Sequence, residues 1–112
     1  MKHAKYIVKG KNIRILPTIL KKELKPSFDY ISSTGKTYFF VLEKYSLLQN
    51  ADMSVIILVD IKNETECVVN SVVAGGKVGL FQLDLFDRED SVLSGIKETL
   101  NKLANDNGWK IN

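Results

Sequence analysis

The chain has 112 residues, of which 45% are hydrophobic and 26% are charged, and its formal net charge is +3. These values are typical of one soluble globular domain spanning residues 1–112, with enough chain for a single hydrophobic core. No apolar run approaches the roughly 18 residues of a membrane span. The first residues lack the apolar stretch of a signal peptide, and the single cysteine allows no internal disulfide, so we expect a cytoplasmic protein without a membrane partner.

The charge is unevenly distributed along the chain. Residues 1–36 contain nine Lys or Arg and two Asp or Glu, whereas residues 37–112 contain seven and eleven. Such asymmetry can indicate an anionic partner, including nucleic acid. The lysines are not interleaved with stacking aromatic residues as in single-strand binders. We therefore interpret them as the solvated faces of the first strand and helix, and do not favour a nucleic-acid partner.

The first third of the chain predicts a strand followed by a helix. Residues 4–9 form the strand. Apolar residues then recur at helical spacing, and the helix is expected to start near Leu16 with Pro17 in its first turn, where no N–H is needed. Pro26 ends it.

Four strands follow, separated by short turns. The strand at residues 53–61 is apolar on both faces, because Ile56 and Leu58 alternate with five apolar residues of the other face. A strand of this kind is usually central in a sheet or covered on both sides. The four predicted strands are residues 27–33, 37–47, 53–61 and 65–73.

A strand at residues 80–86 and a helix at residues 88–107 complete the prediction. Asp87 is expected to cap the helix, whose apolar residues repeat at steps of three and four. Gly108 suits the left-handed position after the helix, and Trp109 can then fold back on Ala104.

The element order β-α-β-β-β-β-β-α predicts an α+β fold. We expect a single antiparallel sheet of about six strands, because the connections between successive strands are short. The two helices are expected to pack on one face of this sheet.

The sequence contains no recognisable catalytic or metal-binding constellation. One histidine, His3, and one cysteine, Cys67, make neither a plausible metal site nor a nucleophile pair. Glu43 and Asp84 leave carboxylate acid–base chemistry formally open, but the favoured interpretation is that both face solvent. We therefore expect a non-enzymatic protein without a cofactor or metal.

Two short segments are candidate binding sites. Gly75, Gly76 and Lys77 form a predicted hairpin turn, whose backbone could also hold an anion. Glu43 and Tyr45 continue one face of the strand at residues 37–47.

That face also carries Phe39 and Val41. Its polar end could line the mouth of a pocket or simply emerge into solvent. If a pocket lies between the sheet and the last helix, Phe39, Glu43, Tyr45 and Phe81 are its expected lining.

Two resemblances accompany these patterns. The order of elements resembles helix-grip and TATA-binding-protein-like folds, in which a curved sheet wraps a C-terminal helix. Residues 43–46 and the turn at residues 73–77 resemble a small bacterial family of unknown function with a tyrosine-serine pair on a middle strand and a Gly-Gly-Ser-Gln turn before its last strand. Here Lys77 and Val78 replace the Ser-Gln pair. This resemblance implies a fold and no particular activity.

The leading functional hypothesis is a module that binds a second copy of itself or another protein through an open sheet face or an edge strand. Two middle strands carry more apolar residues than one helix layer covers, and large exposed apolar patches usually mark interfaces. The alternative is a small-molecule binding module with a pocket between the curved sheet and the C-terminal helix.

Overall fold

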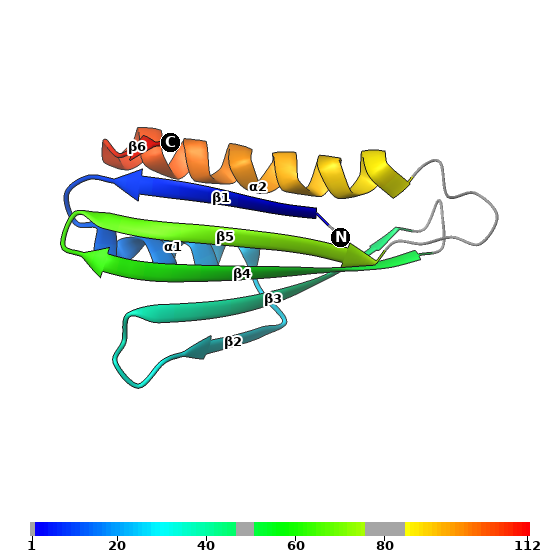
Figure 1. The fold of residues 1–112 in the computed structure, drawn as a ribbon, viewed down its shortest axis with the longest axis horizontal. Coiled ribbons are helices and arrows are strands. Elements are labelled where there is room, and N and C mark those ends of the chain that lie inside the picture. Colours follow the sequence, from blue (N-terminus) through cyan, green and yellow to red (C-terminus); the bar gives the residue numbers. More distant parts are fainter. Residues whose placement is uncertain (1, 47–50, 76–84) are drawn as a thin grey trace.

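The protein is described by a computed structural model that covers residues 2–46, 51–75 and 85–112. These residues form six strands, two α-helices and one 3-10 turn (Figure 1). In chain order the elements are β1 (Lys2–Lys9), η1 (Ile13–Ile15), α1 (Leu16–Leu24), β2 (Phe28–Ile31), β3 (Thr37–Ser46), β4 (Ala51–Asn63), β5 (Glu66–Gly75), α2 (Leu85–Asn107) and β6 (Lys110–Ile111).

The described strands form one antiparallel sheet in the order β2-β3-β4-β5-β1-β6. Strands β2 to β5 follow one another as hairpins, as their short connections predict. Strand β1 lies beside β5, with Lys2 opposite Val73 and Lys9 opposite Glu66. The predicted α+β class with an antiparallel sheet is confirmed.

Both helices pack on the same face of the sheet. Figure 1 shows α2 running alongside β1 and α1 behind β4 and β5. Their buried residues join the inward residues of the strands in one hydrophobic cluster. Its members include Leu16 and Leu20 of α1, Ile96, Leu100 and Leu103 of α2, and Phe40, Val55, Ile57, Val59, Val69 and Val73 of the sheet.

The predicted ends of the helices are largely confirmed. Pro17 lies in the first turn of α1, which ends just before Pro26 with Lys25 in the left-handed conformation at φ 50°. Gly108 takes φ 74° after α2, and the Trp109 N–H donates to the Ala104 carbonyl over 2.8 Å. This bond is the Schellman closure expected from the Gly-Trp pair.

The start of α2 differs from the sequence prediction. Leu85 and Phe86 belong to the helix rather than to a strand, so Asp87 is an internal helical residue and not the N-cap. The physical reason is that Leu85 lies seven residues before Val92 and continues the helical apolar spacing. The rest of the predicted strand, residues 80–84, lies outside the described residues. Among the described residues the sixth strand is β6, which the sequence analysis did not predict.

The C-terminal residues fasten α2 to the beginning of the chain. Strand β6 pairs with the end of β1, and the Trp109 indole Nε1 donates to the Lys11 carbonyl over 2.7 Å. Trp109 is only 5% exposed. The end of the last helix and the β1–η1 turn therefore form one packed unit.

Candidate functional site

One face of the sheet has no described helix over it. On β4, the exposed or half-buried Ser54, Ile56, Leu58 and Asp60 alternate with the buried residues that face the helices. Strand register places the corresponding residues of the other strands on this same side. We call this side the open face. Its apolar residues are Ile7, Phe28, Tyr30, Phe39, Val41, Ile56, Leu58, Val68 and Val72.

The apolar residues of the open face gather over β2, β3 and β4. Phe28 is 54% exposed, Tyr30 is 57% exposed and Ile56 is 37% exposed. Register places Phe28 opposite Val41 and Tyr30 opposite Phe39. The result is a continuous apolar surface rather than isolated exposed side chains.

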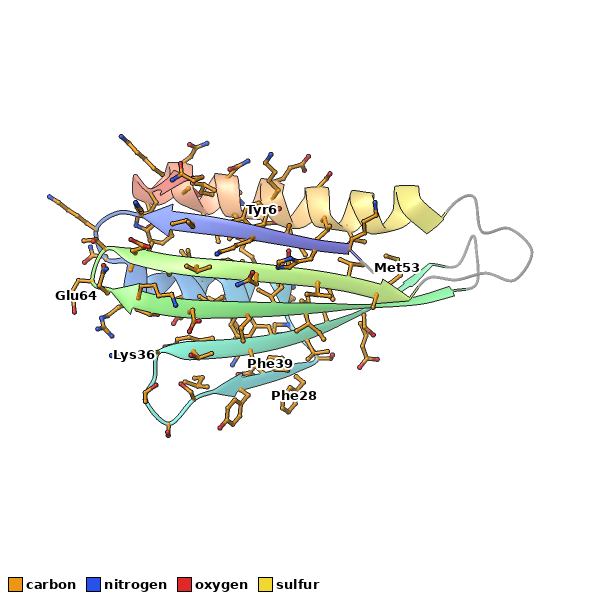
Figure 2. All side chains as sticks on the ribbon, viewed as in Figure 1. Tyr6, Phe28, Lys36, Phe39, Met53 and Glu64 are labelled. Atoms are coloured by element: carbon orange, nitrogen blue, oxygen red, sulfur yellow. The ribbon has the colours of Figure 1, made fainter. Side chains whose placement is uncertain are left out.

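An aromatic pair stiffens the edge of this surface. The Phe28 and Phe39 rings meet edge to face, with centroids 6.4 Å apart and an interplanar angle of 75° (Figure 2). This geometry is a favourable one for aromatic rings. The pair therefore fixes two large apolar side chains of this surface relative to each other.

The polar residues of the open face lie mainly at its margins. On the β1 side, His3 Nε2 is 2.9 Å from Asn70 Oδ1, and Lys5 stands next to Asn70 in register. On the β3 side, the Thr37 hydroxyl donates to Asp60 over 2.8 Å. Among the described residues, no charged side chain lies within the central apolar surface of β2, β3 and β4.

Of the sequence-predicted site residues, the structure describes the side chains of Phe39 and Glu43. Phe39 belongs to the open face, and Glu43 is exposed there, where its carboxylate accepts a 3.4 Å hydrogen bond from the Ser27 hydroxyl. Both lie on the side opposite α2, so neither lines a pocket between the sheet and that helix.

The other predicted site residues are described in part or not at all. Tyr45 and Gly75 are placed as backbone in β3 and β5, where Gly75 pairs with Met53. Gly76, Lys77 and Phe81 lie outside the described residues. Anion binding at this glycine turn stays a prediction.

A pocket of about 400 Å³ lies on the other side of the sheet, between the helices. We call it the interhelix pocket. Its described lining combines the end of α1, two inward residues of β3 and β4, and one side of α2. The residues are Glu23, Leu24, Leu42, Val55, Val92, Gly95, Ile96 and Thr99. A pocket between the sheet and the last helix was the alternative hypothesis from the sequence, and none of the residues predicted to line it belongs to this described lining.

The single histidine and the single cysteine of the chain lie on opposite sides of the sheet. In the described part of the chain, no three His, Cys, Asp or Glu side chains gather as a metal site would require. His3 lies on the open face, whereas Cys67 is fully buried on the helix side. Burial, and secondarily the Glu66 carboxylate, raise the pKa of the Cys67 thiol to about 12. The described helices also include none that is long and apolar enough to cross a membrane.

The Cys67 thiol is expected to be inert in the folded protein. At pH 8 it should react with Ellman's reagent at least about 1,000-fold more slowly than free cysteine, because thiolate is the reactive form. Absorbance of the released thiol measures the rate, and the same protein in guanidinium chloride is the control that should react normally. Fast reaction of the native protein would contradict this assignment of Cys67 to the core.

Comparison with known proteins identifies a family but no activity. No curated protein and no solved structure significantly matches the chain. The helix-grip resemblance accordingly stays a prediction. A family model described as "Family of unknown function (DUF6054)" matches residues 4–104. The match spans β1 to most of α2 and confirms the expected membership of a small family of unknown function. The chain therefore belongs to the DUF6054 family.

Proposed function

We propose that the protein is a non-enzymatic self-association module in which the open face of one copy binds the open face of a second copy. The observation that carries this proposal is the continuous apolar surface on β2, β3 and β4, which no described helix covers. Water contact with such a surface is unfavourable, and burying it provides the driving force for association.

The size of the open face suits a stable dimer. Strands lie about 4.8 Å apart and rise about 3.3 Å per residue, so the four strands from β3 to β1 over eight residues span roughly 19 by 26 Å, and the four-residue β2 extends one edge. With β2 included, this flat projection is about 550 Å², and protruding side chains increase the accessible area. A standard protein interface buries about 800 Å² per partner.

The chemistry of the open face suits an identical face. A two-fold axis brings the same patch together on both copies. The central residues Val41, Ile56 and Leu58 carry no charge, so two copies meet without burying an unpaired ion.

The regular surface of the strands also favours a sheet as the partner element. Two sheets pack face to face about 10 Å apart, with their side chains interdigitated, as in β-sandwiches. The Phe28–Phe39 pair would supply the large anchors that such interfaces use. The alternative partner of the open face is a different protein with an apolar sheet face. The sedimentation experiment below distinguishes this alternative from a second copy of the chain.

Sedimentation velocity over a range of concentrations tests this function. The wild-type protein is expected to form a dimer reversibly, and Ile56→Lys should weaken the dimer by at least about 100-fold, because a lysine would be buried at the interface centre. Ile15→Lys is the matched control: Ile15 is 43% exposed, close to the 37% of Ile56, but lies in η1 outside the sheet.

Two results would contradict self-association through the open face. One is a wild-type protein that stays monomeric at every concentration, which would leave a different protein as the partner. The other is equal weakening of the dimer by both lysine substitutions. Circular dichroism of the variants checks that each remains folded, as expected for substitutions of outward side chains.

A further inference from the structure

The interhelix pocket has the size and lining of a small-molecule site. Its volume of about 400 Å³ falls within the usual range for ligand pockets. Leu24, Leu42, Val55, Val92 and Ile96 supply an apolar wall. Only Glu23 and Thr99 add polar side chains to the described lining. This combination of many apolar groups and a few polar ones is typical of sites that orient one small molecule.

Gly95 belongs to the described lining of the interhelix pocket. It lies in the interior of α2, where glycine is less stable than alanine. Its φ is not positive, and a Cβ placed on it would meet no atom within 4 Å. Neither backbone conformation nor packing against described residues therefore requires a glycine. Because Gly95 has no side chain, the pocket stays open on the side of α2.

The polar groups at the pocket favour a ligand that donates a hydrogen bond. The Thr99 hydroxyl already donates to the Gly95 carbonyl over 3.0 Å, so its oxygen can only accept a further bond. The Glu23 carboxylate is an acceptor, and one of its oxygens lies 3.7 Å from Lys102 Nζ. Its other oxygen can accept a hydrogen bond from an ammonium or hydroxyl group of a ligand.

We propose that the interhelix pocket binds an apolar small molecule whose polar end is a primary amine or a hydroxyl group. The apolar body packs against the half-buried Leu24 and Val92, above the nearly fully buried Leu42, Val55 and Ile96, and the donor end lies at Glu23. The pocket and the open face are on opposite sides of the sheet, since Val55 and Ile56 are successive residues of β4. Binding in the pocket is thus a second function that does not depend on self-association.

Octylamine is a suitable probe, and octanoate is its anionic counterpart of equal chain length. In a titration followed by 1H–15N NMR, octylamine should produce saturable shifts at the amides of Leu24, Leu42, Val55 and Ile96. It should bind at least about 10-fold more tightly than octanoate, because only the amine can donate to Glu23. Glu23→Gln should reduce this preference.

Gly95→Leu tests the position of the ligand. The added side chain fills the pocket from α2 and should weaken octylamine binding at least about 10-fold, while the helical circular dichroism is retained because leucine is a better helix former than glycine. Ser94→Leu adds the same side chain at an exposed neighbouring position outside the described lining and should bind normally.

Three outcomes would overturn the pocket proposal. They are the absence of saturable shifts, equal binding by wild type and Gly95→Leu, and shifts concentrated at Ile56 and Leu58. The last outcome would indicate nonspecific adsorption of the alkyl chain to the open face. None of these results would alter the sedimentation test of self-association, so the two proposals can fail separately.

Discussion

Replacing Trp109 with alanine is expected to lower the free energy of unfolding by about 4 kcal/mol, the range found for buried aromatic residues cut back to alanine. Trp109 is 5% exposed and belongs to the hydrophobic core. The substitution leaves a cavity and also removes the indole donor of the Lys11 carbonyl. It therefore detaches the end of α2 from the β1–η1 turn as well as reducing apolar burial.

Guanidinium chloride unfolding followed by far-UV circular dichroism measures this effect. Fluorescence is unsuitable because Trp109 is the only tryptophan of the chain. Trp109→Phe is the matched control, since it keeps an aromatic ring without the N–H donor and should cost clearly less than alanine. A loss below about 1 kcal/mol for Trp109→Ala would contradict the packing of the C-terminus described above.

Gly10→Ala is expected to lower the free energy of unfolding by about 2 to 3 kcal/mol, although it adds only one methyl group. A Cβ on Gly10 would overlap Trp109 Cδ1 and lie 3.1 Å from Trp109 Cα. The backbone of Gly10 is held in place because its N–H donates to the Thr65 carbonyl over 2.9 Å. Either the buried indole or the backbone must shift.

A double-mutant cycle identifies the cause of the Gly10 effect. In the Trp109→Ala background, the overlapping ring is absent, so Gly10→Ala should cost at least about 1 kcal/mol less than in the wild type. The same chemical unfolding experiment measures all four proteins. An equal cost in both backgrounds would show that the close approach of Trp109 is not the reason for glycine at this position.

The parts of the fold that depend on local sequence could be predicted. Alternation along β3, β4 and β5 and three- and four-residue spacing in α1 and α2 are set by the period of each element. The Schellman closure by Gly108 and Trp109 is also local. The predicted start of α2 was wrong. Leu85 and Phe86 fit the end of an alternating strand as well as the first turn of a helix, so the local pattern did not distinguish the two.

The remaining parts depend on contacts between distant segments. Nothing in residues 4–9 indicates that β1 pairs with β5, more than fifty residues later. The contact of Trp109 with Gly10 and Lys11 likewise joins the two ends of the chain. Such pairings follow from the whole arrangement of the sheet, so a periodic pattern in one segment cannot reveal them.

The candidate site was predictable to the same extent. Alternation placed Phe39, Val41 and Glu43 on one face of a strand, but it did not reveal which face the helices cover, and the register places these residues on the open face. The position of Phe28 on the open face follows only from the register of β2 with β3, which no local pattern reveals. For Gly95 the sequence contains one local indication, a glycine inside an amphipathic helix. Its relation to a pocket follows only from the structure.

Intermolecular NMR contacts test self-association through the open face most directly. In an equal mixture of 13C-labelled and unlabelled protein, isotope-filtered spectra report only contacts between different copies. We predict contacts from the methyl groups of Ile56 and Leu58 on one copy to the aromatic rings of Phe28 and Phe39 on the other. A dimer whose intermolecular contacts instead arise from Ile15 or from the exposed side of α2 would contradict this account.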